Sequence, residues 1–222
     1  MEQQQEEDGF NYVILRLADV IGPRDTSHRW WIYQLWIRLS NVMTEHPVHI
    51  PQFLRSYPIS FVYSRDVSNA IAHIVTHYDK LNESVDNEAF NLAWDKPTDL
   101  TAMLNEIKTH FKMFDLEVEI LDEFDHLNHF YTYPSARAGP MNVTKAVDVL
   151  GWTSTDPSTA INETIQFFED VMKAEQFAQQ RDEIIQVVGA TLFPQHLLKF
   201  YEALEELYEI DLKHFKYPRD EL

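Results

Sequence analysis

The chain has 222 residues, no cysteine and a formal net charge of −18 at neutral pH. Without cysteine, the chain cannot form disulfides, thiolate zinc sites or a thiol nucleophile. The strong negative charge disfavours nucleic acid and anionic membranes as partners, because binding to phosphates depends mainly on Lys and Arg. No apolar run reaches the roughly 18 residues that a membrane-spanning helix needs.

Apolar residues recur with the periods of strands and helices along the chain. In order, the expected elements are the end of a helix at 1–9, a strand at 12–18, a helix at 28–43, short strands at 48–50 and 59–63, a helix at 66–77, a strand at 89–93, a helix at 100–111, a strand at 116–120, helices at 143–150 and 160–172, and further helix over 175–210. Strands that alternate with helices indicate an α/β protein with parallel pairing.

Only the segments 12–18 and 89–93 have the nearly continuous apolar character of strands buried on both faces of a sheet. Two central strands cannot form a doubly wound sheet with both edges protected. The chain is therefore expected to be part of something larger. An open, apolar edge on the strand at 12–18 also predicts aggregation or self-association.

Four segments carry a resemblance to a known family. They are YVILRLADVIGPRD at 12–25, FVYSRDV at 61–67, FNLA at 90–93 followed by Pro97-Thr98, and KAVDVLGW at 145–152. In order and spacing they resemble motifs of the NAD-dependent epimerase/dehydratase family, the extended short-chain dehydrogenases. Arg16, Gly22 and Pro23 match the first motif, whereas Leu17 and Ile21 replace its usual proline and aromatic residue.

The resemblance covers about residues 10–172 and implies an α/β fold. The expected fold is the C-terminal part of a Rossmann-type extended short-chain dehydrogenase, with an incomplete parallel sheet, a substrate-capping segment and a helical tail. Residues 1–172 would form the epimerase/dehydratase-like part, and residues 173–222 a helical extension.

Two signatures of the family's chemistry do not occur in the sequence. The chain has no G-x-x-G-x-x-G loop for the pyrophosphate, and Tyr12, Tyr33, Tyr57 and Tyr78 lack a Lys four residues later. The family carries its Tyr-x-x-x-Lys just before the strand at 12–18, so the chain is expected to start just past that lysine. We accordingly assign no catalytic residue, and expect NAD or NADP in a full-length parent with none bound tightly by this chain.

Ten residues make up the site expected in a full-length parent. Ligands of open α/β sheets bind beyond the carboxyl ends of strands. The resemblance therefore implies cofactor contacts from the segment that leaves the first strand: Leu17, Ala18, Asp19 and Val20. Substrate contacts are expected from a basic, aromatic cluster and two further polar residues: His28, Arg29, Trp30, Tyr33, Arg55 and Asn91.

Each group has a structural alternative. The segment after the first strand could be an ordinary strand exit, and the aromatic cluster could pack in the core with Arg29 solvated. Asn91 could equally close a turn. The family often carries a phosphate-binding arginine where this chain has Ile59 and Ser60, although Arg55 lies nearby. Its absence weakens the inference to a nucleotide-diphosphate sugar.

Three further features concern helix caps and a possible zinc site. Asp66 is expected to cap the helix that follows it, and Thr98 or Asp99 to cap the helix at 100–111. His73 and His77 have the spacing of a zinc site, but Ile74 stands where its catalytic glutamate would be, so no metal is expected.

The last four residues, Arg219-Asp220-Glu221-Leu222, resemble an endoplasmic-reticulum retrieval signal. They predict the lumen of that compartment if a full-length parent has a signal peptide, and the cytoplasm otherwise.

The function implied by the resemblance is that of a truncated NAD(P)-dependent epimerase/dehydratase-like protein. It would supply the substrate-side half of a site for a nucleotide sugar or a related small-molecule substrate, and be inactive alone. The alternative is a non-enzymatic regulatory or protein-binding member of the same superfamily. RNA binding, which is associated with relatives such as the chloroplast stem-loop-binding proteins, is disfavoured by the charge of −18.

Overall fold

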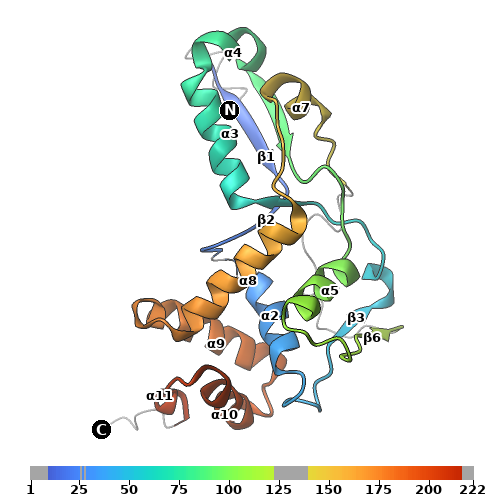
Figure 1. The fold of residues 1–222 in the computed structure, drawn as a ribbon, viewed down its shortest axis with the longest axis vertical. Coiled ribbons are helices and arrows are strands. Elements are labelled where there is room, and N and C mark those ends of the chain that lie inside the picture. Colours follow the sequence, from blue (N-terminus) through green and yellow to red (C-terminus); the bar gives the residue numbers. More distant parts are fainter. Residues whose placement is uncertain (1–9, 26, 28, 123–139, 217–222) are drawn as a thin grey trace.

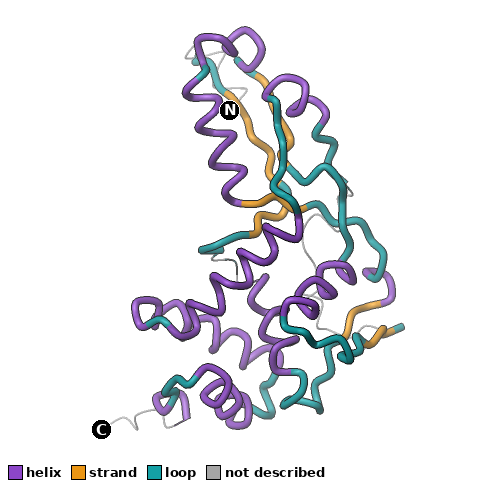
Figure 2. Tube along the Cα trace, in the orientation of Figure 1, coloured by secondary structure: helices purple, strands orange, loops and turns teal. Residues whose placement is uncertain are grey.

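The structure is a computed structural model that describes residues 10–25, 27, 29–122 and 140–216. The helix end expected at 1–9 and the terminal segment 219–222 lie outside these residues, as does His28 of the expected site. The elements are arranged in two parts, one built around a pair of strands and one made mostly of helices (Figures 1 and 2).

The first part is built on a parallel pair of strands, β1 (Val13–Leu17) and β5 (Glu88–Leu92). Helices α3 (Ser64–Thr76), α4 (Tyr78–Val85) and α7 (Thr144–Leu150) lie around this pair (Figure 1). A small hydrophobic core fills the space between them, made of Ala18, Val62, Ala70, Ile74, Val85, Phe90, Leu92, Ala93, Ala146, Leu150 and Trp152.

Strand β1 is less buried than its apolar sequence predicts. Val13 and Leu15 pack against the small core, whereas Arg16 is exposed and Leu17 keeps 42% of its surface exposed. Among the described residues β1 has one ladder partner, β5, so its other edge is unpaired. The expectation of burial on both faces was wrong for this chain, because Val13, Ile14 and Leu15 are only half-buried and the strand's last two residues are exposed.

Two further strand pairs are short and also parallel. They are β2 (Asp19–Ile21) with β4 (Phe61–Tyr63), and β3 (His49–Pro51) with β6 (Glu119–Leu121). All three pairs in the described residues have the parallel direction that the alternation of strands and helices predicts. The last strand begins three residues later than predicted.

The second part contains most of the helices and the larger hydrophobic core. Its elements are α2 (Arg29–Leu39), the 3-10 turn η1 (Gln52–Leu54), α5 (Leu100–His110), α8 (Pro157–Lys173), the 3-10 turn η2 (Glu175–Phe177), α9 (Ala178–Leu192), α10 (Leu197–Tyr208) and α11 (Lys213–Lys216). Helix α2 is buried on all sides, because apolar residues occupy nearly every position rather than one stripe.

Helix ends follow from local sequence. The Asp99 carboxylate accepts a hydrogen bond from the Ala102 N–H at 2.8 Å, so Asp99 caps α5, as one of the two residues expected. Helix α7 ends where Gly151 adopts a left-handed conformation with φ of 63°. The Trp152 N–H then donates to the Ala146 carbonyl at 3.1 Å, which directs the Trp152 ring into the small core.

Residues of α9 and α10 share the larger core with α2 and α8. The boundary predicted at residue 173 stays a prediction, since a shared core neither requires nor excludes a separate extension. None of the described helices is long and apolar enough to cross a membrane.

We expect the chain to self-associate through the unpaired edge of β1. Leu17→Lys puts a charge at this edge and should shift the chain toward monomer, because edge lysines oppose strand pairing. Val187→Lys, which changes an exposed valine on α9, is the matched control and should have no such effect. Sedimentation velocity over a concentration series measures both, and a wild-type chain that stays monomeric throughout would contradict the expectation.

Candidate functional site

Ala18 and Asp19 lie where the chain passes from β1 to β2, at the carboxyl end of the β1–β5 pair. The Ala18 N–H donates to the carbonyl of the last residue of β5 at 3.1 Å. The Asp19 N–H donates to the Ser60 carbonyl at 3.2 Å, so the chain changes partner within two residues. Leu17 before this junction is exposed and Val20 after it is half-buried. This is the edge at which ligands of parallel sheets bind.

Arg29, the first residue of α2, forms an ion pair with Asp19. Its Nη1 lies 2.7 Å from the Asp19 Oδ1, and the two side chains are 32% and 4% exposed. The Arg29 Nε also donates to the Ser27 hydroxyl at 3.2 Å. Sequence reasoning selected Asp19 and Arg29 for different roles, and the structure brings them together. An anionic ligand at this edge has to share the guanidinium with a buried carboxylate.

Trp30 and Tyr33 lie inside the larger core, with 0% and 1% of their surfaces exposed. The Trp30 Nε1 donates to the Gln34 Oε1 at 3.0 Å, within the same helix. Because α2 is buried on all sides, neither ring presents a face to a ligand in this conformation. Both are therefore left out of the site proposed below, in contrast to the stacking role expected from the sequence.

Arg55 lies on a separate surface pocket of about 480 Å³. The pocket is lined by Gln52, Phe53, Arg55, Ser56, Tyr57 and Pro58. The Arg55 backbone is held by the Thr101 hydroxyl, which donates to its carbonyl at 2.8 Å. Its side chain is exposed, and no ion pair to the guanidinium occurs within the described ranges. Exposed Phe53 and Tyr57 flank this cation in the sequence, so an aromatic surface and a charge share one pocket.

Asn91 lies on β5, beside Arg16 of β1 in the strand register. Its side-chain nitrogen donates to the Asn142 carbonyl at 2.8 Å. This bond ties β5 to the segment that precedes α7. The structure thus gives Asn91 a local partner, and its part in a substrate site stays a prediction.

Asp66 does not cap α3, and the expectation from the sequence was wrong. The helix begins at Ser64, which puts Asp66 inside its first turn. The buried Asp66 carboxylate instead accepts from the Thr155 N–H at 2.8 Å and from the Thr155 hydroxyl at 2.6 Å. The side chain therefore joins α3 to the segment between α7 and α8, a contact that local sequence does not specify.

His73 and His77 stack with ring centroids 4.5 Å apart. The His77 Nδ1 lies 3.0 Å from the His73 carbonyl, at the C-terminal end of α3. Across the part of the chain that the structure describes, no group of three His, Asp or Glu side chains could hold a metal ion.

Sequence reasoning missed a cluster around Tyr63, at the end of β4. The Tyr63 hydroxyl donates to Glu163 of α8, and the Arg65 Nη2 lies 3.0 Å from the same carboxylate. Burial raises the pKa of Tyr63 to about 12, and the hydrogen bond to Glu163 adds to this. A catalytic tyrosine that acts as a base needs the opposite shift. Two sequence signals lie near this cluster: the FVYSRDV segment at 61–67, which contains Tyr63 and Arg65, and Gly22, where an added Cβ would lie 2.2 Å from the Ser64 hydroxyl.

Comparison with known proteins gives matches among solved structures only. No protein-family model and no curated protein matches the chain. The UDP-glucose 4-epimerase of Thermotoga maritima, solved with UDP-glucose, matches at 23% identity and a TM-score of 0.57, over 77% of this chain and 50% of that one. The UDP-glucuronic acid 4-epimerase of Bacillus cereus, solved with UDP-glucuronic acid and NAD, matches at 16% identity and a TM-score of 0.53, over 77% and 49%.

The dTDP-glucose 4,6-dehydratase of Bacillus anthracis, solved with NAD, matches at 12% identity and a TM-score of 0.53, over 76% and 48% of the two chains. The fold is that of the NAD-dependent epimerases and dehydratases, the extended short-chain dehydrogenases. The resemblance seen in the sequence is therefore confirmed at the level of fold. The chain spans about half the length of the solved structures that it matches.

Asp66→Ala should lower the free energy of unfolding by about 2–4 kcal/mol, because two hydrogen bonds to a buried charged acceptor are lost and two donors of Thr155 are left without it. Asp99→Ala, which removes an exposed helix cap, is the matched control and should cost about 1 kcal/mol. Urea denaturation compares the two. Equal losses would mean that Asp66 acts only as a local helix residue.

Proposed function

We propose that this chain forms the substrate-side half of a nucleotide-sugar epimerase- or dehydratase-type site, and that the dinucleotide is held by a separate unit. The fold match over about half of each solved enzyme is the observation that carries this proposal. The sequence agrees, since it contains neither a G-x-x-G-x-x-G loop nor a Tyr-x-x-x-Lys pair at the tyrosines noted above.

The Arg55 pocket is the proposed anion-binding part of this half-site. An exposed guanidinium can bind phosphate oxygens with two parallel hydrogen bonds, and an adjacent aromatic face can stack on a base or sugar. Arg55, Phe53 and Tyr57 supply both features within one pocket. This combination supports a diphosphate-linked sugar despite Ile59 and Ser60 at the position where the family often has arginine.

The Asp19–Arg29 pair is the proposed part of the half-site that faces the cofactor. It lies at the carboxyl end of the β1–β5 pair, with Ala18 beside it. Asp19 is buried and paired with Arg29, so the two side chains hold each other in place and leave this edge with little net charge. We propose that Leu17, Ala18, Asp19 and Val20 form a wall of the nicotinamide site, and contribute no atom to the chemistry.

NAD or NADP is the cofactor that this proposal implies. The described residues offer only the wall just named, and they include no glycine-rich loop to hold a pyrophosphate. The chemistry that a nicotinamide supplies when bound is hydride transfer to and from the substrate carbon. What this chain contributes is orientation of the sugar nucleotide and exclusion of water from one side.

Isothermal titration calorimetry with UDP-glucose and with NAD tests the proposal on the isolated chain. We expect weak, saturable binding of UDP-glucose that Arg55→Gln weakens at least about tenfold, since a charge-assisted bidentate contact contributes on the order of 1.5–3 kcal/mol. Lys80→Gln removes one positive charge from exposed helix α4 and is the matched control.

NAD should give no saturable heat with the isolated chain. Micromolar binding of NAD would refute the claim that the dinucleotide is held elsewhere. If UDP-glucose fails to bind, or if Lys80→Gln weakens binding as much as Arg55→Gln does, the half-site assignment is wrong. The non-enzymatic, protein-binding alternative would then be favoured.

A further inference from the structure

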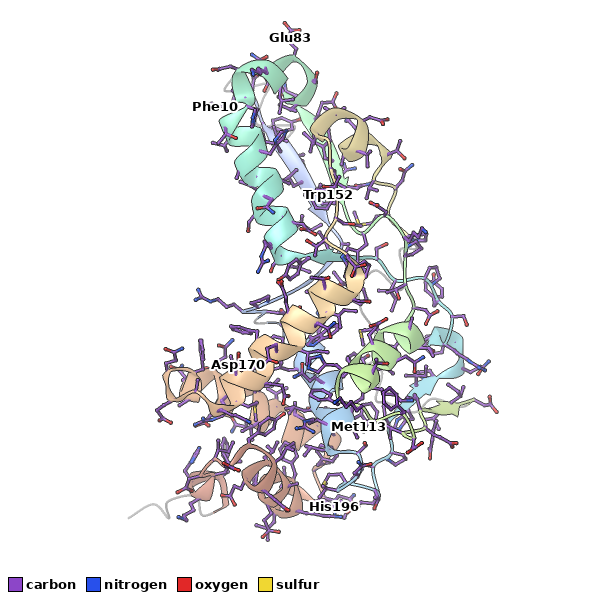
Figure 3. The ribbon with its side chains drawn as sticks, in the orientation of Figure 1. Phe10, Glu83, Met113, Trp152, Asp170 and His196 are labelled. Atoms are coloured by element: carbon purple, nitrogen blue, oxygen red, sulfur yellow. The ribbon has the colours of Figure 1, made fainter. Side chains whose placement is uncertain are left out.

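Ionisable and aromatic side chains join two segments at the helical end of the molecule. The loop at 40–48, between α2 and β3, supplies Glu45 and His46. The turn between α9 and α10 supplies His196, which lies far from Trp152 and the strand pair (Figure 3). The Lys199 Nζ on α10 donates to both Glu45 carboxylate oxygens, at 2.8 and 2.9 Å. The His196 Nδ1 lies 3.8 Å from the Glu45 Oε1.

The surroundings of the His46 ring favour its neutral form over its protonated form. The ring makes edge-on contacts with Phe193, at 5.3 Å between ring centroids, and with His196, at 5.0 Å. Its Nε2 is buried and has no hydrogen-bond partner within the described ranges. The backbone of His46 is fixed as well, because the Trp36 Nε1 donates to its carbonyl at 3.0 Å. A proton on this ring would place a charge where no acceptor meets it.

We propose that the contact between His46 and His196 forms a pH-sensitive latch, which holds the α9–α10 turn against the loop at 40–48 while the His46 ring is neutral and releases it when mild acid protonates that ring. The latch rests on contacts outside the proposed half-site and stands whether or not that site binds a ligand. Protonation of His46 would put an imidazolium ring 5.0 Å from the His196 ring and near the Lys199 ammonium, while the Glu45 carboxylate is already paired with Lys199.

The direction of the pH effect follows from His46. Burial lowers its pKa below the usual 6.5, and the charges of His196 and Lys199 act the same way, while Glu45 opposes them. The closed state therefore has its full stability above pH 6.5 and loses it as the pH falls through 6.5 toward the lowered pKa. The hydrogen bond from Lys199 lowers the pKa of Glu45 to about 2, so the ion pair persists while His46 titrates.

His49 is a second titratable group near the latch. Its ring packs edge-on against Trp36 at 4.9 Å, and burial lowers its pKa too, while the Pro47 carbonyl and Glu119 oppose this. It faces β6 and the core rather than α10, so its protonation would disturb β3 and leave the α9–α10 turn in place. The experiment therefore has to separate His46 from His49.

The absence of cysteine makes a direct distance measurement possible. Spin labels on Thr44→Cys and Leu198→Cys lie on opposite sides of the latch at exposed positions, with Leu198 57% exposed. Double electron–electron resonance at about pH 7.5 and about pH 5.5 should show a longer second distance appearing in acid. Each unit by which the folded state lowers the pKa of His46 changes the open-to-closed ratio on the order of tenfold.

His46→Phe keeps an aromatic ring against Phe193 and removes the proton, so the acid-induced distance should disappear. His46→Gln, which also removes the titrating ring, tests the same point if the first variant folds poorly, which thermal melting at about pH 7.5 reveals. His110→Gln, a histidine paired with Asn162 on other elements, is the control and should retain the full change. A distance that does not change with pH would overturn the latch, as would a change that survives in His46→Phe or is lost only in His49→Phe.

Discussion

The helical part of the molecule depends on the hydrogen bonds that the Glu169 carboxylate of α8 accepts from two other helices. The carboxylate accepts from the Gln34 Nε2 of α2 at 2.9 Å and from the Tyr208 hydroxyl of α10 at 2.8 Å. The Arg38 Nε lies 3.6 Å away. The Glu169 side chain is only 14% exposed, and a carboxylate so far withdrawn from water is costly unless it is paired and hydrogen-bonded, so these partners have to stay in place together. Burial beside Glu169 also raises the pKa of Tyr208 well above 10, which keeps its hydroxyl available as a donor.

By holding α2 in place, these contacts also set the positions of the groups at its two ends. The N-terminal end carries Arg29 against Asp19 at the strand edge, and the C-terminal end leads into the loop that holds Glu45 and His46. The candidate ligand edge and the latch thus depend on one helix, whose position is set by contacts to α8 and α10 in its middle. The polar groups around Glu169 join three helices, and the partly buried ion pair with Arg38 adds little net stability by itself.

Sequence periodicity predicted most of the elements but missed helix α4 and strand β2, because the apolar repeat is set by burial and these two short elements carry little of it. It could not predict how much of β1 is covered. The run at 12–18 has the composition of a central strand, yet the exposure of Arg16 and Leu17 depends on which other elements pack beside and over the strand. The local sequence of a strand does not determine which other elements pack against it.

The site was less predictable than the fold. Asp99 caps α5 as expected, since a cap is a contact over three residues. Asp66 has the same residue type in a similar position but bonds Thr155, which is 89 residues away. The ion pair between Asp19 and Arg29 likewise needs β1 and α2 to be placed before it exists. Chemical type can nominate such residues, whereas only tertiary packing decides which of them meet.

The two ends of α2 differ in how they could transmit a change. The helix has 11 residues and is buried on all sides, so moving it would disturb the close-packed larger core. The loop at 40–48 is held on its α10 side by groups at the surface, and it continues directly into β3 and η1, next to Arg55. Loosening of this loop would therefore reach the Arg55 pocket more readily than the Asp19–Arg29 pair. The two proposed halves of the ligand site would then respond differently to acid, with the anion-binding pocket affected first and the strand edge held by the rigid helix.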